Sequence, residues 1–119
     1  MKINNKSNIL IVGLGIVGGS YARGFTKAGY KVNAIDTDRE TIDFALENNI
    51  VARGTTKIDR EMIESADVII FALYPHIFKE WIEKNQWYFR SGTIIADVLG
   101  VKGGLVRYIQ DILRYDCEY

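Results

Sequence analysis

Short apolar runs alternate along the chain with longer segments in which apolar residues recur at helical spacing. The runs at residues 9–12, 67–73 and 93–98 carry few polar positions, which is typical of strands buried on both faces of a parallel sheet. Each segment between the runs has one apolar stripe, as amphipathic helices do. This alternation predicts an α/β fold whose parallel strands are joined by right-handed crossovers.

The same pattern places the individual elements. We expect strands at residues 9–12, 31–36, 50–55, 67–73 and 93–98, and residues 117–119 could begin a sixth. We expect helices at residues 16–28, 37–49 and 59–66, a fourth from Pro75 and a last one from Leu105 to Leu113. In the fourth helix the inward residues should be Ile77, Phe78, Trp81 and Ile82.

Three local signals support the helix boundaries. Gly29 follows the first helix, at a position where glycine commonly ends a helix. Thr37 and Glu40 have the spacing of a capping box at the start of the second helix. Pro75 suits the first turn of the fourth helix, because its ring fixes the backbone and its missing N–H has no partner there in any case.

A glycine-rich loop joins the first strand to the first helix. It reads Gly13-x-Gly15-x-x-Gly18, and the acidic Asp36 stands at the end of the next strand. In such a loop the first glycine allows the tight turn, the second lets a pyrophosphate approach the backbone, and the third lets helix and strand pack closely. The free N–H groups of the first helical turn then hold the phosphates.

This combination predicts a Rossmann-type, doubly wound, mainly parallel sheet of five to six strands with helices on both faces, which binds NAD. The expected cofactor residues in this half of the chain are Gly13, Leu14, Gly15, Ile16, Val17, Gly18, Asp36, Thr37 and Arg39. The alternatives are a purely structural turn for the glycines and a solvated strand-end acid for Asp36.

Asp36 indicates NAD over NADP. Its carboxylate can accept hydrogen bonds from the ribose hydroxyls, whereas a 2′-phosphate would bring a second negative charge close to it. Two unit charges at 4 Å near a protein surface repel each other by about 4 kcal/mol. Arg39 is expected to be a surface residue, although it could cover the adenine or offset part of this repulsion.

Composition excludes several classes of function. The 15 basic and 15 acidic side chains balance, and this argues against a nucleic-acid or anionic-membrane surface. No apolar run approaches the length of a membrane span. The single cysteine allows no intrachain disulfide and favours the cytoplasm, and one histidine with one cysteine offers no metal site.

The residues also resemble a known family. "VGLGIVGGSYARGFTKAGYKVNAIDTD", with Gly18-Gly19-Ser20, is similar to the opening of prephenate dehydrogenases. "ADVIIFALYP" resembles the strand that borders the nicotinamide in that family, and "TIIADVLGVKGGLV" resembles its Asp-Val-x-Ser-Val-Lys segment. The resemblance implies four further cofactor residues: Leu73, Tyr74, Pro75 and Asp97. It also implies a catalytic role for Lys102. Gly100 stands where many members carry a serine.

The resemblance implies that residues 1–119 are the NAD-binding domain of an enzyme that converts prephenate to 4-hydroxyphenylpyruvate by oxidative decarboxylation. The family's catalytic histidine and its helical domain, which binds prephenate or arogenate and forms the homodimer, would then lie beyond Tyr119. His76 is expected to be a surface residue, and the chain alone should be inactive. Two alternatives stay open: another NAD-dependent β-hydroxyacid or imine-type dehydrogenase, and a non-enzymatic nucleotide-sensing domain.

Overall fold

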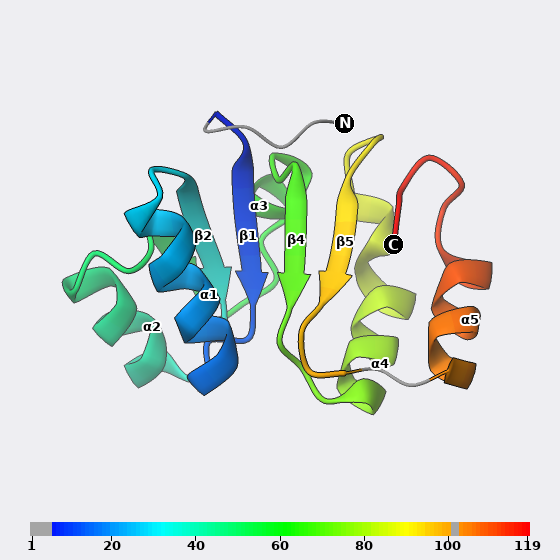
Figure 1. Ribbon diagram of the computed structural model, residues 1–119, viewed down its shortest axis with the longest axis horizontal. Coiled ribbons are helices and arrows are strands. Elements are labelled where there is room, and N and C mark those ends of the chain that lie inside the picture. Colours follow the sequence, from blue (N-terminus) through cyan, green and yellow to red (C-terminus); the bar gives the residue numbers. More distant parts are fainter. Residues whose placement is uncertain (1–5, 101–102) are drawn as a thin grey trace.

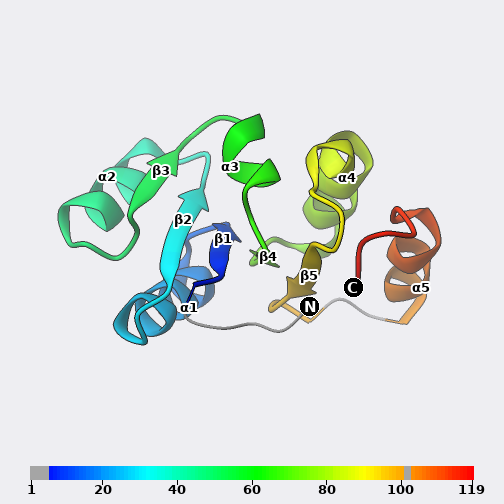
Figure 2. The ribbon, with the colours of Figure 1, turned by 90° about the horizontal axis from the view of Figure 1, so that it is seen from above.

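The computed structural model describes residues 6–100 and 103–119. It contains a parallel five-stranded sheet with helices on both faces, as the alternating pattern predicts (Figures 1 and 2). The strands are β1 (Asn8–Val12), β2 (Lys31–Ile35), β3 (Arg53–Thr55), β4 (Val68–Phe71) and β5 (Ile94–Asp97). The helices are α1 (Ile16–Lys27), α2 (Arg39–Glu47), α3 (Arg60–Glu64), α4 (Pro75–Asn85), η1 (Gln86–Tyr88) and α5 (Gly103–Ile112).

The strand order is β3-β2-β1-β4-β5, so that the first strand of the chain lies at the centre of the sheet. β1 pairs in parallel with β2 on one side and with β4 on the other, and Val12 is opposite both Ile35 and Phe71. From β1 the chain forms β2 and β3 on one side, and it then crosses back to form β4 and β5 on the other side. Ligands of such sheets bind at this reversal point, outside the carboxyl ends of the strands.

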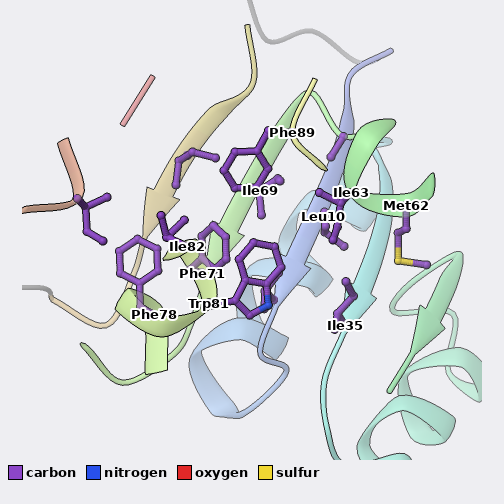
Figure 3. Packing of buried hydrophobic residues seen from close by; sticks show 14 residues of the cluster. Leu10, Ile35, Met62, Ile63, Ile69, Phe71, Phe78, Trp81, Ile82 and Phe89 are labelled. Atoms are coloured by element: carbon purple, nitrogen blue, oxygen red, sulfur yellow. The ribbon is translucent and has the colours of Figure 1, made fainter. Parts of the chain in front are cut away.

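Two hydrophobic clusters cover the two faces of the sheet. α1 and α2 pack on one face and contribute Ala22, Ile42 and Ala45 to its cluster. α3, α4 and α5 pack on the opposite face, where Phe78, Trp81 and Ile82 of α4 surround Phe71 of β4 (Figure 3). The ring centroids of Phe71 and Trp81 are 4.9 Å apart. Strands buried on both faces explain why the sequence runs are almost continuously apolar.

Two details of the predicted helices are wrong. Thr37 and Glu40 form no capping box, because α2 begins one residue later, with Asp38 as its N-cap, and Asp36 accepts the Asp38 N–H at 2.8 Å. Ile77 is 41% exposed instead of buried, since it stands in the first turn of α4, where the helix reaches past the edge of the sheet. In α3, by contrast, the side chain of Asp59 does cap the helix, accepting the Met62 N–H at 3.1 Å.

The last residues lie along the outer edge of β5 (Figure 1). Glu118 forms an isolated parallel bridge with Ile94, so the possible sixth strand is present only as this single contact. Arg114 fixes the segment: its guanidinium donates to Phe89 O at 2.6 Å and pairs with Asp116 at 2.7 Å. In the part of the chain that the structure describes, no helix has the length and apolarity needed to cross a membrane.

Substitution of Gly24 tests how helix propensity within α1 affects the stability of the protein. It is exposed in the helix interior, and no described atom lies within 4 Å of a Cβ built there. Gly24→Ala should therefore raise the free energy of unfolding by about 0.5–1 kcal/mol, measured by urea denaturation. The matched control is Gly29→Ala, which should destabilise by about 1 kcal/mol because Gly29 has a φ of +95°. A stabilising effect of both changes would contradict this explanation.

Candidate functional site

A cleft of about 410 Å³ opens where the carboxyl ends of β1 and β4 meet the start of α1. Gly13 and Asp36 reach it from the ends of β1 and β2, and Ala72 reaches it from the end of β4. The complete lining is Gly13, Gly15, Ile16, Val17, Gly18, Asp36, Ala72, Leu73, Tyr74, Ile77 and Leu99. The cleft thus lies at the reversal point of the sheet and contains residues from all the segments that the glycine motif and Asp36 single out.

The three motif glycines meet different surroundings. A Cβ at Gly13 would lie 2.5 Å from Ala72 O, and the residue has a φ of +97°, so the tight turn requires glycine. A Cβ at Gly18 would lie 1.8 Å from Gly13 O, so α1 can approach β1 only without it. No described atom lies within 4 Å of a Cβ at Gly15, which faces the open cleft.

The first turn of α1 presents backbone N–H groups toward this space. The helix begins at Ile16 with Gly15 as its N-cap, and among the described residues no side chain caps it and no acid stands in its first turn. Ile16 is 95% exposed. The first N–H groups of a helix have no partner within the helix, and they carry the positive end of its dipole. The start of α1 is therefore suited to an anion.

Asp36 connects the two loops of this site. Its Oδ2 accepts the Leu14 N–H at 2.6 Å, and its Oδ1 accepts the Asp38 N–H at 2.8 Å. The carboxylate is half-buried and is held in place by backbone groups from both the glycine loop and the start of α2. Each carboxylate oxygen can accept a further hydrogen bond. Asp36 is thus held at the cleft by two backbone hydrogen bonds.

A second hollow, of about 250 Å³, continues from Asp36 between the ends of β2, β3 and β4. Its lining is Val12, Gly13, Ile35, Asp36, Thr37, Thr56, Ile58, Leu73, Ile77 and Trp81. Arg39 lies at its margin, where its Nη2 donates to Thr56 Oγ1 at 3.3 Å and its Nη1 is 3.6 Å from Asp43. The indole N–H of Trp81 is buried and has no partner among the described residues. This hollow is mostly apolar, with hydroxyls at its edge.

Tyr74, Pro75 and Asp97 lie at the same edge of the sheet, with different contacts. Tyr74 is 71% exposed and precedes Pro75, the first residue of α4. Asp97 ends β5, and its carboxylate accepts the Tyr119 hydroxyl at 2.7 Å. Lys102 lies outside the described residues. Gly100 has a φ of +77°, a conformation that favours glycine over a residue with a side chain, such as serine.

Sequence reasoning missed eight residues that line the two hollows: Val12, Ile35, Thr56, Ile58, Ala72, Ile77, Trp81 and Leu99. Most of them stand at or just after the ends of strands, and that position alone is the signal that could have found them.

The other reactive side chains that the structure describes lie apart from one another. His76, the one histidine of the chain, is exposed in the first turn of α4. Burial raises the pKa of the Cys117 thiol and so disfavours the reactive thiolate. Within the described ranges, no three His, Cys, Asp or Glu side chains gather as metal ligands would.

Known proteins are similar to this chain in sequence and in fold. Residues 21–118 match the family described as "Prephenate dehydrogenase, nucleotide-binding domain". Over 102 residues the chain is 30% identical to the prephenate dehydrogenase of Lactococcus lactis subsp. cremoris, covering 82% of this chain and 28% of that protein.

Solved structures of such enzymes are also similar to this chain. Prephenate dehydrogenase from Aquifex aeolicus, crystallised with hydroxyphenyl propionate and NAD+, matches with a TM-score of 0.83 and 29% identity over 98% of this chain and 41% of that one. Synechocystis arogenate dehydrogenase matches in fold, with a TM-score of 0.75 and 24% identity over 82% of this chain and 34% of that one. The chain therefore spans less than half the length of these relatives. It belongs to the family of prephenate dehydrogenase nucleotide-binding domains.

Proposed function

We propose that this chain is the NAD-binding domain of a prephenate dehydrogenase and that the dinucleotide lies across the carboxyl ends of β1 and β4. The observation that carries the proposal is the open space at Gly15, between the uncapped start of α1 and the carboxylate of Asp36. Gly13 and Gly18 close up the backbone on either side of this space, and Gly15 leaves room for a ligand. The residues present fit a dinucleotide.

The pyrophosphate would bind at the first turn of α1. Backbone N–H groups of Ile16, Val17 and Gly18 would donate to its oxygens, and the helix dipole would favour its negative charge. This arrangement needs no basic side chain. It also explains why the residues of the turn itself are exposed and apolar, because only their backbone is used.

Asp36 would bind the ribose of the adenosine half. Its oxygens keep acceptor capacity beyond the Leu14 and Asp38 N–H groups and would take the ribose hydroxyls. A 2′-phosphate would be repelled by the carboxylate, so NAD should bind better than NADP. Arg39 is held by Asp43 and Thr56 at the margin of the hollow and would offset only part of this repulsion.

The two halves of the cleft would take the two ends of the dinucleotide. The apolar hollow lined by Thr37, Ile58 and Trp81 suits the flat adenine ring. Leu73, Tyr74 and Pro75, with Leu99 opposite, would border the nicotinamide. A cofactor contact of Asp97 and a catalytic role of Lys102 belong to the same proposal and are supported only by the family resemblance.

The reaction that we propose for the whole enzyme is the oxidative decarboxylation of prephenate or arogenate in tyrosine biosynthesis, in the cytoplasm. NAD, when bound, supplies the hydride acceptor for this reaction. The residues of this chain would bind and orient the dinucleotide, while the substrate, the proton-accepting base and the homodimer contacts would involve parts of the enzyme outside these 119 residues. The family match does not favour a β-hydroxyacid dehydrogenase, an imine-type enzyme or a nucleotide-sensing domain.

Titration of the chain with NADH and NADPH, followed by calorimetry, tests this function. We expect the wild-type chain to bind NADH more tightly than NADPH. Asp36→Ala should weaken NADH binding about tenfold, because the ribose hydroxyls lose a charged acceptor. The matched control is Asp111→Ala, an exposed acid of α5 outside both hollows, which should bind NADH like the wild type. No binding of NADH by the folded wild-type chain would refute the proposal.

A further inference from the structure

The C-terminal segment holds a tyrosine hydroxyl at the end of β5. The Glu118 N–H donates to Thr93 O at 3.0 Å, and the Ile95 N–H donates to Glu118 O at 2.6 Å. These bonds keep the segment parallel to β5, with the C-terminus beside that strand (Figures 1 and 2). Tyr119 therefore follows a residue whose backbone is already paired with the sheet.

The side chain of Tyr119 is fixed at both its ring and its hydroxyl. The ring packs against Phe78 of α4, with 5.8 Å between the centroids, and belongs to the cluster on that face of the sheet. The hydroxyl donates to Asp97 Oδ2 at 2.7 Å. Burial and the Asp97 carboxylate both raise the pKa of Tyr119, so the hydroxyl keeps its proton, and with it the hydrogen bond, at physiological pH.

Asp97 stands two residues before Leu99, which forms one wall of the cleft. The next residue, Val98, donates its N–H to Phe71 O at 3.0 Å. Leu99 then lines the cleft together with Tyr74 and Ile77. Because only one residue separates Asp97 from Leu99, we expect a shift of the Asp97 backbone to move Leu99 as well.

We propose that Tyr119 is a positioning residue for the nicotinamide half of the cleft: its hydroxyl holds Asp97, and Asp97 holds the Leu99 wall against which that half of the dinucleotide lies. The inference rests on the proposed function. In this arrangement the Oδ2 atom of Asp97 accepts its hydrogen bond from the C-terminal segment. The adenosine half of the cleft lies at Asp36 and Thr37, after the end of β2, whereas the Tyr119–Asp97 hydrogen bond lies at the end of β5.

Tyr119→Phe removes the hydroxyl and keeps the ring. Two ligands distinguish the halves of the cleft: NAD+, and ADP-ribose, which lacks the nicotinamide. We expect Tyr119→Phe to bind NAD+ about threefold to tenfold more weakly than the wild type, as for the loss of one hydrogen bond, and to bind ADP-ribose with unchanged affinity. The control is Tyr115→Phe, since Tyr115 is fully exposed and should leave both affinities unchanged.

The outcomes separate the two proposals. Equal weakening of both ligands in Tyr119→Phe would indicate a general structural effect and overturn the positioning role, as would unchanged NAD+ binding. Either result leaves the NAD-binding function intact if the wild type binds both ligands. If the folded wild-type chain binds neither ligand, the proposed function fails, and the positioning role fails with it. Thermal denaturation of each variant shows that the compared chains are folded.

Discussion

Gly18→Ala should destabilise the protein by about 3 kcal/mol or more, the largest effect that we expect from a single methyl group in this chain. A Cβ at Gly18 would lie 1.8 Å from Gly13 O and 3.0 Å from the Ala72 side chain. The first neighbour is backbone in a tight turn and cannot rotate away. The methyl group must therefore push α1 off β1 and β4, at the centre of the sheet. Urea denaturation of the variant and the wild type measures the difference.

The neighbouring Gly19 supplies the control. A Cβ at Gly19 has its nearest described contact at 3.6 Å, an ordinary van der Waals distance. Gly19→Ala should therefore leave stability unchanged or raise it slightly, through the better helix propensity of alanine. If the two variants were equally stable, close packing of α1 on the sheet would not be the reason for glycine at position 18.

Gly15→Val should abolish most dinucleotide binding and leave the fold intact. Its Cβ would enter open space, with no described atom within 4 Å. It would occupy the position from which the pyrophosphate approaches the start of α1. We expect the affinity for NADH to fall about a hundredfold, a loss of roughly 2.7 kcal/mol, measured by calorimetry.

The contrast with Gly18→Ala makes this prediction specific. Gly15→Val should unfold at the same urea concentration as the wild type, within about 0.5 kcal/mol, whereas Gly18→Ala should not. An intermediate variant, Gly15→Ala, should lose part of the affinity. Unchanged NADH binding by a folded Gly15→Val chain would show that the pyrophosphate does not bind at α1.

Much of the fold could be predicted because it depends on local patterns. Apolar runs identify strands buried on both faces, and Gly29 marks the end of α1 through its need for a positive φ. The glycine motif and Asp36 are likewise local, and the structure brings them to one edge of the sheet.

The errors and omissions arise from contacts between distant residues. The capping box at Thr37 is wrong because the Asp36 carboxylate takes the Asp38 N–H and α2 starts later. Thr56, Ile58 and Leu99 were missed as cleft residues, since their place depends on where β3 and β5 end and on the order of the strands in the sheet. The Tyr119–Asp97 hydrogen bond joins residues 22 positions apart, and no spacing rule indicates it.

The central position of β1 in the sheet affects how the domain can form while the chain is being translated. The Asn8 N–H, at the start of β1, binds Asp67, 59 residues later in the chain. β1 can pair with β2 soon after both are made, but its other edge stays open until β4 has been synthesised. Because the cleft is lined by Gly13 and Ala72 together, a nascent chain that ends before Ala72 lacks one wall of the proposed nucleotide site. We therefore expect the cofactor to stabilise the finished domain and to give no help to its first half during translation.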